Sequence, residues 1–261
     1  MIRAMWTSAS GMQTQQMNID VISNNLANSS TPGYKKMALQ FEDVMYQTEK
    51  SPGAKLSDGS STPTGLQVGY GSRPTATSKS FQQGDMQNTG ESLDVAIQGR
   101  GFFEVDLPDG TKAYTRDGSF KLNSDGELVT NLGYKVSGTS QIDTNATEIA
   151  IATDGTITIR VNGDLQSLSP ITLANFPNPS GLRNMGNNLF VESDASGAVE
   201  TGLTPGTNGI GGLAQGFLES SNVRVVEEMV RMIEAQRAYE INSKAIQTSD
   251  EMLSLATNLK R

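Results

Sequence analysis

The sequence contains no cysteine and no histidine among its 261 residues. Without cysteine the chain has no disulfide, no thiolate nucleophile and no cysteine metal ligand. Without histidine it lacks the Ser-His-Asp and Cys-His catalytic arrangements and the commonest metal ligand. Any catalysis would have to use carboxylates, Lys, Tyr or Ser alone. Composition alone therefore does not exclude an enzyme.

Long apolar runs and excess positive charge are also missing. No run of about 18 apolar residues is present, so we expect no membrane span. The first sixteen residues lack the continuous apolar segment of a cleaved signal peptide. The formal net charge is −8, which argues against nucleic-acid binding through a basic patch. The 36% hydrophobic content is enough for a core in one or two domains.

The C-terminal stretch from Val223 to Leu259 contains neither Gly nor Pro. Its apolar side chains recur at multiples of three and four residues, which predicts one face of a helix. Ser221 or Asn222 could cap the start of this helix. A helix of this length would extend about 55 Å and would need a partner along most of it. The face consists of Val226, Val230, Ile233, Ile241, Ala245, Met252, Leu255 and Leu259.

Residues 1–28 form a second candidate helix. Its apolar positions have a mean step near 3.5 residues, which is the coiled-coil period. We therefore expect the two ends of the chain to pair as a coiled-coil core, although docking of each helix on its own domain is the simpler alternative. We further hypothesise that both ends are mobile in the free monomer and become helical on polymerisation. The N-terminal positions are Ile2, Met5, Ala9, Met12, Ile19 and Leu26.

A turn-rich segment, NNLANSSTPGYKK, follows the first helix, and Pro32-Gly33 breaks it. Residues 37–50 fit either a short helix or an extended strip. Residues 51–65 are rich in Gly, Ser, Pro and Thr, so they are either a surface loop or a segment that orders only against a neighbouring molecule.

From about Leu66 to Ser221 the hydrophobic period changes to two, with Gly-containing turns between short segments. Asn162-Gly163 is a type I′ hairpin signal. The pattern predicts an antiparallel all-β domain inserted between the terminal helices, and hence an α+β fold. The expected division is 1–28 with 222–261 as a helical core, 29–69 as a linker and extended segment, and 70–221 as a β-rich domain.

Few motifs in the β region could carry chemistry. GRGFF at residues 99–103 lacks the third Gly and the helix of a nucleotide site, so a tight β connection is expected. NSDGE at residues 123–127 lacks the alternating acids of a calcium loop and reads as a hairpin turn. No spacing selects a catalytic pair from the carboxylates Asp94, Asp106, Asp109 and Asp117, which we expect at the surface or in turns.

Three groups of residues resemble signatures of the flagellar rod, hook and hook-associated axial proteins. They are NNLANSSTPGYKK near the start, LDVAIQGRGFFEV with AYTRDGSF and GELVTNLGYKV in the β region, and SNVRVVEEMVRMIEAQRAYEINSKAIQTSDEML at the end. The match extends over essentially the whole chain. Within the family, the closest resemblance is to members that build the distal rod of the bacterial flagellum.

The resemblance implies a structural axial component of the basal body that polymerises helically into a rigid hollow rod and transmits torque from motor to hook. It implies export without cleavage through the flagellar type III apparatus and a location crossing the periplasm. The implied partners are other copies of the chain, the proximal rod proteins, the hook protein and the surrounding P- and L-ring bushing. The resemblance implies a protein that is not an enzyme and that uses no metal and no cofactor, and it implies neither nucleic acid nor a membrane span.

The resemblance also implies that the terminal helices form an inner core around a channel while the β domain faces outward. The stretch 46–69 resembles the distal rod rather than the hook, and is implied to brace subunits and keep the rod straight. We expect the subunit interface at the helix-face positions and in the turn after the first helix: Met5, Ala9, Met12, Ile19, Leu26, Asn24, Asn25, Asn28, Pro32, Gly33, Tyr34, Val226, Val230, Ile233, Ile241, Ala245, Met252, Leu255 and Leu259.

Three alternatives compete with this interpretation. Within the family, the chain could be a proximal rod or hook protein. In a different class, it could be a secreted carbohydrate-binding β protein with oligomerising helices, although Trp6, the only Trp, lies in the first helix. A membrane-surface protein is a weaker alternative, because it would need a basic polar helix face and the charges of residues 223–261 balance.

Overall fold

The computed structural model describes residues 2–53, 63–143, 146, 148–207 and 209–258. The chain forms two compact units, which we describe separately. The first unit comprises Met1–Leu26, Met37–Ser78 and Arg224–Arg261, and the second comprises Ala27–Lys36 and Lys79–Val223. Two long helices and a large set of β-strands confirm the α+β class predicted from the sequence. The predicted division at residues 28/29, 69/70 and 221/222 stays a prediction.

The first unit contains both helices, α1 (Ile2–Ala27) and α2 (Val225–Asn258). Each begins and ends within two residues of the predicted bounds, except that Leu259 lies outside the described residues. Two carboxylates, Glu227 and Glu228, occupy the first turn of α2, where they interact favourably with the helix dipole.

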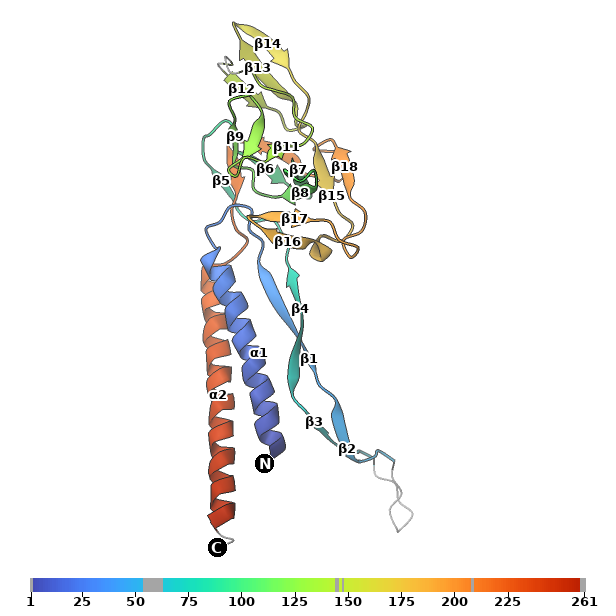
Figure 1. The fold of residues 1–261 in the computed structure, drawn as a ribbon, viewed down its shortest axis with the longest axis vertical. Coiled ribbons are helices and arrows are strands. Elements are labelled where there is room, and N and C mark those ends of the chain that lie inside the picture. The colour runs from blue at the N-terminus through green and yellow to red at the C-terminus, as the bar shows by residue number, and fades with distance from the viewer. Residues whose placement is uncertain (1, 54–62, 144–145, 147, 208, 259–261) are drawn as a thin grey trace. The chain divides into compact units, whose positions relative to one another are not determined.

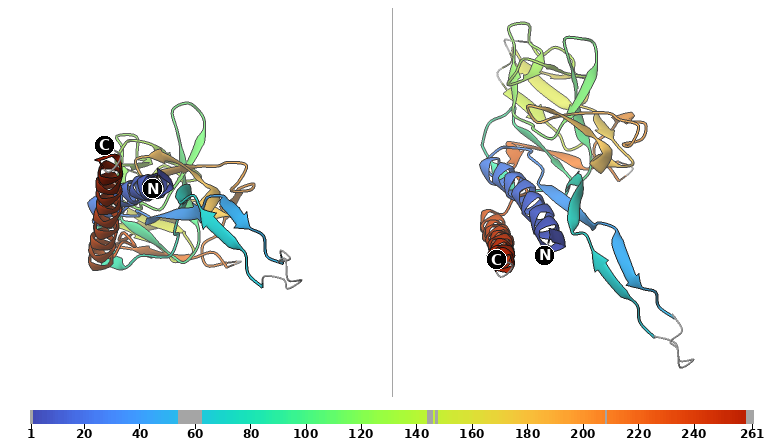
Figure 2. Two further views of the ribbon diagram at one scale, coloured as in Figure 1. Left: turned by 90° about the horizontal axis from the view of Figure 1, so that it is seen from below. Right: turned by 60° about the horizontal axis from the view of Figure 1, so that its bottom comes forward.

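The helices α1 and α2 lie side by side and antiparallel (Figures 1 and 2). Asn25 Nδ2 donates to Glu228 Oε2 at 3.0 Å. At Gly11 an added Cβ would come within 2.9 Å of Asn242 Nδ2. Both Gly11 to Asn25 and Glu228 to Asn242 are separations of 14 residues, so the two contacts share one register.

A long two-stranded ribbon completes the first unit. It is built from β1 (Met37–Asp43), β2 (Tyr46–Lys50), β3 (Leu66–Gly69) and β4 (Ser72–Lys79). β1 pairs with β4 and β2 pairs with β3. Backbone bonds from Val44 N to Gly71 O (2.9 Å) and from Tyr70 N to Met45 O (3.2 Å) join the two pairs (Figure 1).

The ribbon resolves one choice that the sequence left open. Residues 37–50 are strands rather than a helix, because they pair with residues 66–79 across the ribbon. The segment 51–65, expected as a loop or an interface element, connects β2 with β3. Its residues 54–62 lie outside the described residues.

The second unit is the β domain. Its nine-stranded sheet has the order β16-β17-β8-β7-β11-β10-β9, with β15 beside β7 and β18 beside β15, and β12, β13 and β14 form a separate three-stranded sheet. The strand pairs described in this domain are antiparallel, which confirms the predicted class. The strands are β5 (Met86–Asn88), β6 (Val95–Gln98), β7 (Phe102–Asp106), β8 (Lys112–Thr115), β9 (Phe120–Leu122), β10 (Leu128–Thr130), β11 (Lys135–Val136), β12 (Glu148–Ile151), β13 (Ile157–Val161), β14 (Asp164–Ser167), β15 (Leu173–Asn175), β16 (Arg183–Gly186), β17 (Leu189–Val191), β18 (Glu200–Leu203), β19 (Gly212–Gln215) and β20 (Phe217–Glu219), with a 3₁₀ turn, η1 (Pro179–Gly181).

The predicted turns of the β domain are confirmed. Asn162 and Gly163 have φ values of 52° and 95° between β13 and β14, as a type I′ hairpin requires. At Gly99 an added Cβ would meet the Cα of Gly211 at 2.9 Å, so GRGFF is a tight β connection. The residues NSDGE connect β9 with β10 as a hairpin.

Two clusters of buried side chains form the core of this domain. The larger cluster, which includes Phe103, Ile157, Ile171 and Leu213, lies among several sheets, and the smaller cluster is mostly aromatic. No helix in the described part of the chain is long and apolar enough to cross a bilayer.

Candidate subunit interface and its supporting contacts

The apolar stripe predicted on α2 lies on the outer surface of the first unit. Six of its positions, Val226, Val230, Ile233, Ile241, Met252 and Leu255, are exposed by 50–75%. Ala245 is half-buried, and Leu259 lies outside the described residues. An apolar stripe of this size on one helix is unusual for an isolated monomer and marks a surface for interaction.

A different stripe of α2 faces inward. Glu228, Ala235 and Ser249 are buried and Asn242 is half-buried. These four positions recur every seven residues, as coiled-coil contact positions do. The inner seam is therefore small and polar, and the predicted apolar stripe lies outside it.

The predicted positions on α1 are mostly half-buried. Met5, Met12, Ile19 and Leu26 are covered in part, whereas Ala9 and Asn24 are exposed. The buried side chains of α1 are Thr14, Ile22 and Asn25, and of these only Asn25 is a predicted interface residue.

The ribbon contacts α1 along one line of side chains. Arg3 donates from Nη1 to Gln47 Oε1 and from Nη2 to Glu49 Oε1, both at 3.0 Å. Further along α1, the hydroxyl oxygens of Thr14 and Ser72 lie 3.3 Å apart. Gly71 lies so close to α1 that an added Cβ would stand 2.1 Å from the hydroxyl oxygen of Ser10. The absence of a side chain at Gly71 therefore permits the close approach.

Asn25 connects three segments of the first unit. Its Nδ2 donates to the Met37 carbonyl at 2.8 Å, and its Oδ1 accepts from the Met37 N–H at 2.9 Å. The same Nδ2 donates to Glu228 at 3.0 Å. Arg231 Nη1 lies 3.6 Å from the other oxygen of Glu228. One buried amide thus fixes the end of α1 against the start of β1 and the first turn of α2.

The remaining predicted interface residues belong to the turn after α1, in the second unit. Asn28 and Pro32 are half-buried, and Gly33 and Tyr34 are buried. Gly33 has a φ of +69°, and an added Cβ would meet the Asp117 backbone nitrogen at 2.6 Å, so this turn requires glycine. Because Gly33 and Tyr34 are covered by their own chain, a direct contact between subunits through them stays a prediction.

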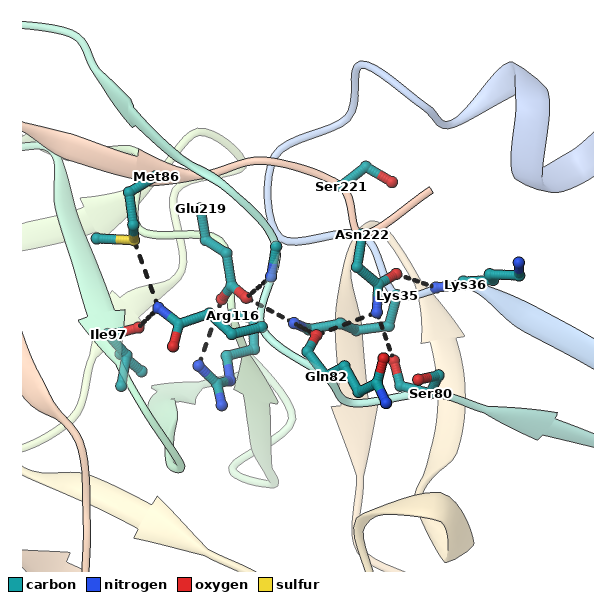
Figure 3. A network of polar contacts seen from close by, with 12 residues as sticks. Lys35, Lys36, Ser80, Gln82, Met86, Ile97, Arg116, Glu219, Ser221 and Asn222 are labelled. Carbon is teal, nitrogen blue, oxygen red and sulfur yellow. Dashed lines mark hydrogen bonds and ion pairs between the residues drawn. The ribbon is translucent and has the colours of Figure 1, made fainter. Parts of the chain in front are cut away.

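A buried charge cluster secures this turn to the β domain (Figure 3). Lys35 Nζ donates to Glu219 Oε1 at 2.6 Å and to the Gln82 carbonyl at 2.8 Å. Arg116 Nη1 lies 3.3 Å from Glu219 Oε2, and its Nη2 donates to the Gly99 carbonyl at 2.7 Å. The Gly33 N–H donates to the Glu219 carbonyl at 2.8 Å. The side chains of Lys35 and Glu219 are fully buried.

Two cations share one carboxylate in this cluster. Burial lowers the pKa of Lys35, and the attraction of Glu219 opposes that shift. Burial likewise lowers the pKa of Arg116 against the same attraction. A buried pair of this kind contributes little net stability, but loss of one partner leaves an uncompensated charge in the interior.

Asn222 adds neutral bonds next to the cluster. It accepts from the Lys36 N–H at 2.7 Å and donates to the Ser80 and Gln82 carbonyls at 2.9 and 3.0 Å (Figure 3). Asn222 is therefore not the cap of α2, and this expectation was wrong. Ser221 Oγ accepts from the Val223 N–H at 3.3 Å, before the helix begins at Val225.

Sequence reasoning missed the charge cluster. Lys35 and Glu219 are 184 residues apart, and both stand in turn-rich or short-strand sequence where charged side chains are usually solvated. No local spacing connects them. Asn25 was found only as a turn residue, without its partners Met37 and Glu228.

Two of the four carboxylates weighed as catalytic candidates, Asp109 and Asp117, have local roles, whereas Asp94 is buried and not at the surface. Asp109 Oδ1 accepts from the Thr111 N–H at 2.9 Å, and Asp117 Oδ1 accepts from the Ser119 N–H at 3.0 Å. These bonds stabilise the turns in which the aspartates stand. In the parts of the chain that the structure covers, no group of three or more acidic side chains is placed to hold a metal ion.

Comparison with known proteins gives matches at both ends and in the middle of the chain. Residues 5–35 match the family described as flagella basal body rod protein. Residues 96–159 match the D1 domain of the flagellar hook protein FlgE/F/G. Residues 214–259 match the C-terminal region of the flagellar basal body rod FlgEFG proteins.

Curated relatives are similar over the whole length. The flagellar basal-body rod protein FlgG of Buchnera aphidicola (subsp. Acyrthosiphon pisum) is 51% identical over 99% of this chain and 100% of its own. The protein of the same name from Borreliella burgdorferi is 50% identical over the full length of both chains. The Bacillus subtilis protein of that name is 42% identical, again over the full length of both.

Proposed function

This chain belongs to the family of flagellar basal-body rod proteins that carry the name FlgG and is a structural component of the distal rod, and we propose that its copies polymerise helically into a rigid hollow shaft that transmits torque from the motor to the hook. In this role the protein performs no catalysis. It is exported by the flagellar type III apparatus and lies in the basal body, crossing the periplasm. Its partners there are the proximal rod proteins, the hook protein and the P- and L-ring bushing.

The observation that carries the proposal is the exposed apolar face of α2. Val226, Val230 and Ile233 in its first three turns are at least half exposed, and Ile241 and Leu255 continue the face further along the helix. Removal of this area from water would stabilise an assembly by roughly 25 cal/mol for each Å² of apolar surface covered. A second copy with the same face provides the apolar cover.

The seven-residue repeat of the inner face supports a coiled-coil core. Glu228, Ala235, Asn242 and Ser249 direct one face of α2 toward α1, which leaves the apolar face for neighbouring copies. Each subunit would then contribute a pre-paired set of helices, and each apolar face would meet a helix of the next subunit. The predicted interface residues on α1 and in the 28–34 turn belong to the same proposal.

The β1–β4 ribbon is the feature that supports the proposed rigidity of the rod. Its contacts with α1 at Arg3 and Thr14 fix it along the helix, so the extended segment would be held against its own subunit while its end reaches a neighbour. These contacts hold the ribbon at two points along α1, near Arg3 and near Thr14. The 46–69 stretch therefore braces subunits and keeps the rod straight.

The proposal is tested by Ile233→Asp in the full chain, with Gln236→Asp as the matched control. Both variants add one negative charge to an exposed position of α2. We expect Ile233→Asp to prevent polymerisation, as measured by sedimentation and electron microscopy, while circular dichroism shows an intact β domain. Gln236→Asp should polymerise as the unmodified chain does. Normal polymerisation of Ile233→Asp would contradict the proposal.

A further inference from the structure

Methionine supplies all of the sulfur in this chain. The sequence contains eleven methionines and no cysteine, so its reversible sulfur oxidation is the conversion of methionine to methionine sulfoxide. The thioether is apolar and flexible, whereas the sulfoxide is polar and its oxygen accepts hydrogen bonds. Oxidation of a methionine on an assembly surface therefore changes the chemistry of that surface.

Two methionines belong to the exposed surface of α2 that the proposed assembly covers. Met229 is 49% exposed, and Val226 and Ile233 are its neighbours on the helix surface because they are three and four residues away. Met252 is 50% exposed, and the exposed Leu255 lies three residues further along the same helix. A small oxidant can therefore reach both sulfurs in the free subunit, and both adjoin apolar side chains of the outer face.

Hydrogen peroxide oxidises a thioether in one two-electron step. A lone pair of the sulfur attacks one peroxide oxygen, the S–O bond forms as the O–O bond breaks, and the second oxygen leaves as water after proton transfer. Methionine is oxidised and peroxide is reduced, and no other reactant is needed. Because peroxide must reach the sulfur, cover by a neighbouring copy slows the reaction.

The sulfoxide has different consequences in the free subunit and beneath a second copy. In the free subunit the new oxygen stands on a half-exposed side chain and stays hydrogen-bonded to water, so α2 keeps its fold. When a neighbouring copy covers the apolar face, this oxygen loses its water and meets apolar side chains, and a buried acceptor without a partner is unfavourable. Oxidation therefore weakens the addition of a subunit to the polymer without unfolding the subunit.

We propose that Met229 and Met252 are oxidation sites through which peroxide prevents free subunits from assembling. The inference rests on the proposed function, because the sulfoxides act through the face that neighbouring copies cover. The assembled polymer covers both sulfurs and resists the oxidant. Methionine sulfoxide reductases convert the sulfoxide back to the thioether, so the effect is reversible.

The first test measures the lowest concentration at which the full-length chain forms sedimenting polymer, before and after treatment with hydrogen peroxide. Mass spectrometry of proteolytic fragments gives the sulfoxide fraction at each methionine. We expect full conversion of Met229 and Met252 to raise this threshold by roughly tenfold, with unchanged circular dichroism. Repair with methionine sulfoxide reductases A and B should restore it. An unchanged threshold overturns the proposal, and so does a loss of the helical signal, because the effect would then be unfolding.

Matched variants locate the effect on the helix. The double variant Met229→Leu with Met252→Leu replaces both thioethers by hydrocarbon side chains of similar volume, and its threshold should stay within roughly twofold of the untreated chain, with or without peroxide. Met185→Leu is the control, because it removes a 55% exposed methionine of the β domain. The control should remain as sensitive to peroxide as the unmodified chain. A double variant that loses assembly after treatment overturns the assignment to these two residues.

The second test compares free and assembled protein, with N-acetylmethionine in the same tube as the reference for peroxide. We expect sulfoxide at Met229 and Met252 to form roughly tenfold more slowly in the polymer, because the contact excludes the oxidant. Equal rates overturn the inference, whereas the polymeric function stands in that case because the untreated chain has assembled. If the untreated chain forms no polymer at any concentration, the proposed function fails and this inference fails with it.

Discussion

The ammonium nitrogen of Lys35 lies 2.6 Å from a carboxylate oxygen of Glu219, and neither side chain is exposed to solvent. Lys35 follows the turn after α1, whereas Glu219 ends the last strand of the β domain. The pair therefore closes the β domain by joining the segments through which the chain enters and leaves it.

The first prediction concerns this closure. Glu219→Gln keeps the shape of the side chain but leaves the charges of Lys35 and Arg116 buried without a carboxylate. We expect it to lower the free energy of unfolding of the β domain by about 3–5 kcal/mol. Urea unfolding followed by near-ultraviolet circular dichroism of the tyrosines measures this loss. Arg160→Met breaks an exposed pair with Glu148 and should cost at most about 1 kcal/mol. Similar losses for the two variants would show that the buried cluster has no special role.

The second prediction concerns pH and Lys79. Burial lowers the pKa of Lys79 to about 8, while its ammonium lies 4.7 Å from the centre of the Phe190 ring. Between pH 8 and the ordinary lysine pKa of 10.5, the unfolded chain binds more protons than the folded chain. The free energy of unfolding therefore rises with pH in this window and has no dependence on Lys79 below it.

Lys79 is only partly shielded from solvent, and the Phe190 ring favours its charged form. We therefore expect the free energy of unfolding to rise by roughly 1 kcal/mol across this pH window. The measurement is the difference in urea stability between the unmodified chain and Lys79→Met at pH 7 and pH 10. Other groups that titrate in this range contribute to both proteins and cancel in the difference. A difference that is the same at both pH values would refute the lowered pKa.

The third prediction concerns Asn25. Asn25→Ala removes two bonds to the Met37 backbone and one to the buried carboxylate of Glu228. We expect a loss of about 2–4 kcal/mol in the stability of the helical unit, because buried polar groups are left without this partner. Amide hydrogen exchange along α1 and β1 measures the loss locally. Ser23→Ala, at an exposed position of α1, should leave exchange unchanged. Unaltered protection in Asn25→Ala would contradict its role as the junction of three segments.

The fourth prediction concerns the ribbon. Deletion of residues 47–64 removes most of β2 and the segment after it, together with the Gln47 and Glu49 contacts of Arg3. We expect the chain still to polymerise, because the apolar face of α2 is intact, but to form a more curved or bendable polymer. Electron microscopy of the assembled protein gives the curvature. A polymer as straight as that of the full chain would refute the bracing role.

Local sequence determined the two helices and the hairpins of the β domain. The bounds of α2 followed from the absence of Gly and Pro after Val223 and from the spacing of its apolar residues at multiples of three and four residues. The β13–β14 hairpin followed from Asn162-Gly163, because few other pairs adopt positive φ at both turn positions. The α+β class followed from the change of the hydrophobic period near residue 66, from the helical spacing to the strand period of two residues. Each of these signals arises from a backbone preference or a repeat within a few residues.

Tertiary structure decided which faces and charges meet. Periodicity located an apolar face on α2, but the face that meets α1 is the polar one with Glu228 and Asn242, because the pairing depends on Asn25 of another helix. Residues 37–50 became strands because residues 66–79 pair with them. Lys35 and Glu219 met because the fold closes a separation of 184 residues. A single sequence records local preferences directly, whereas contacts between distant residues depend on the free energy of the whole fold.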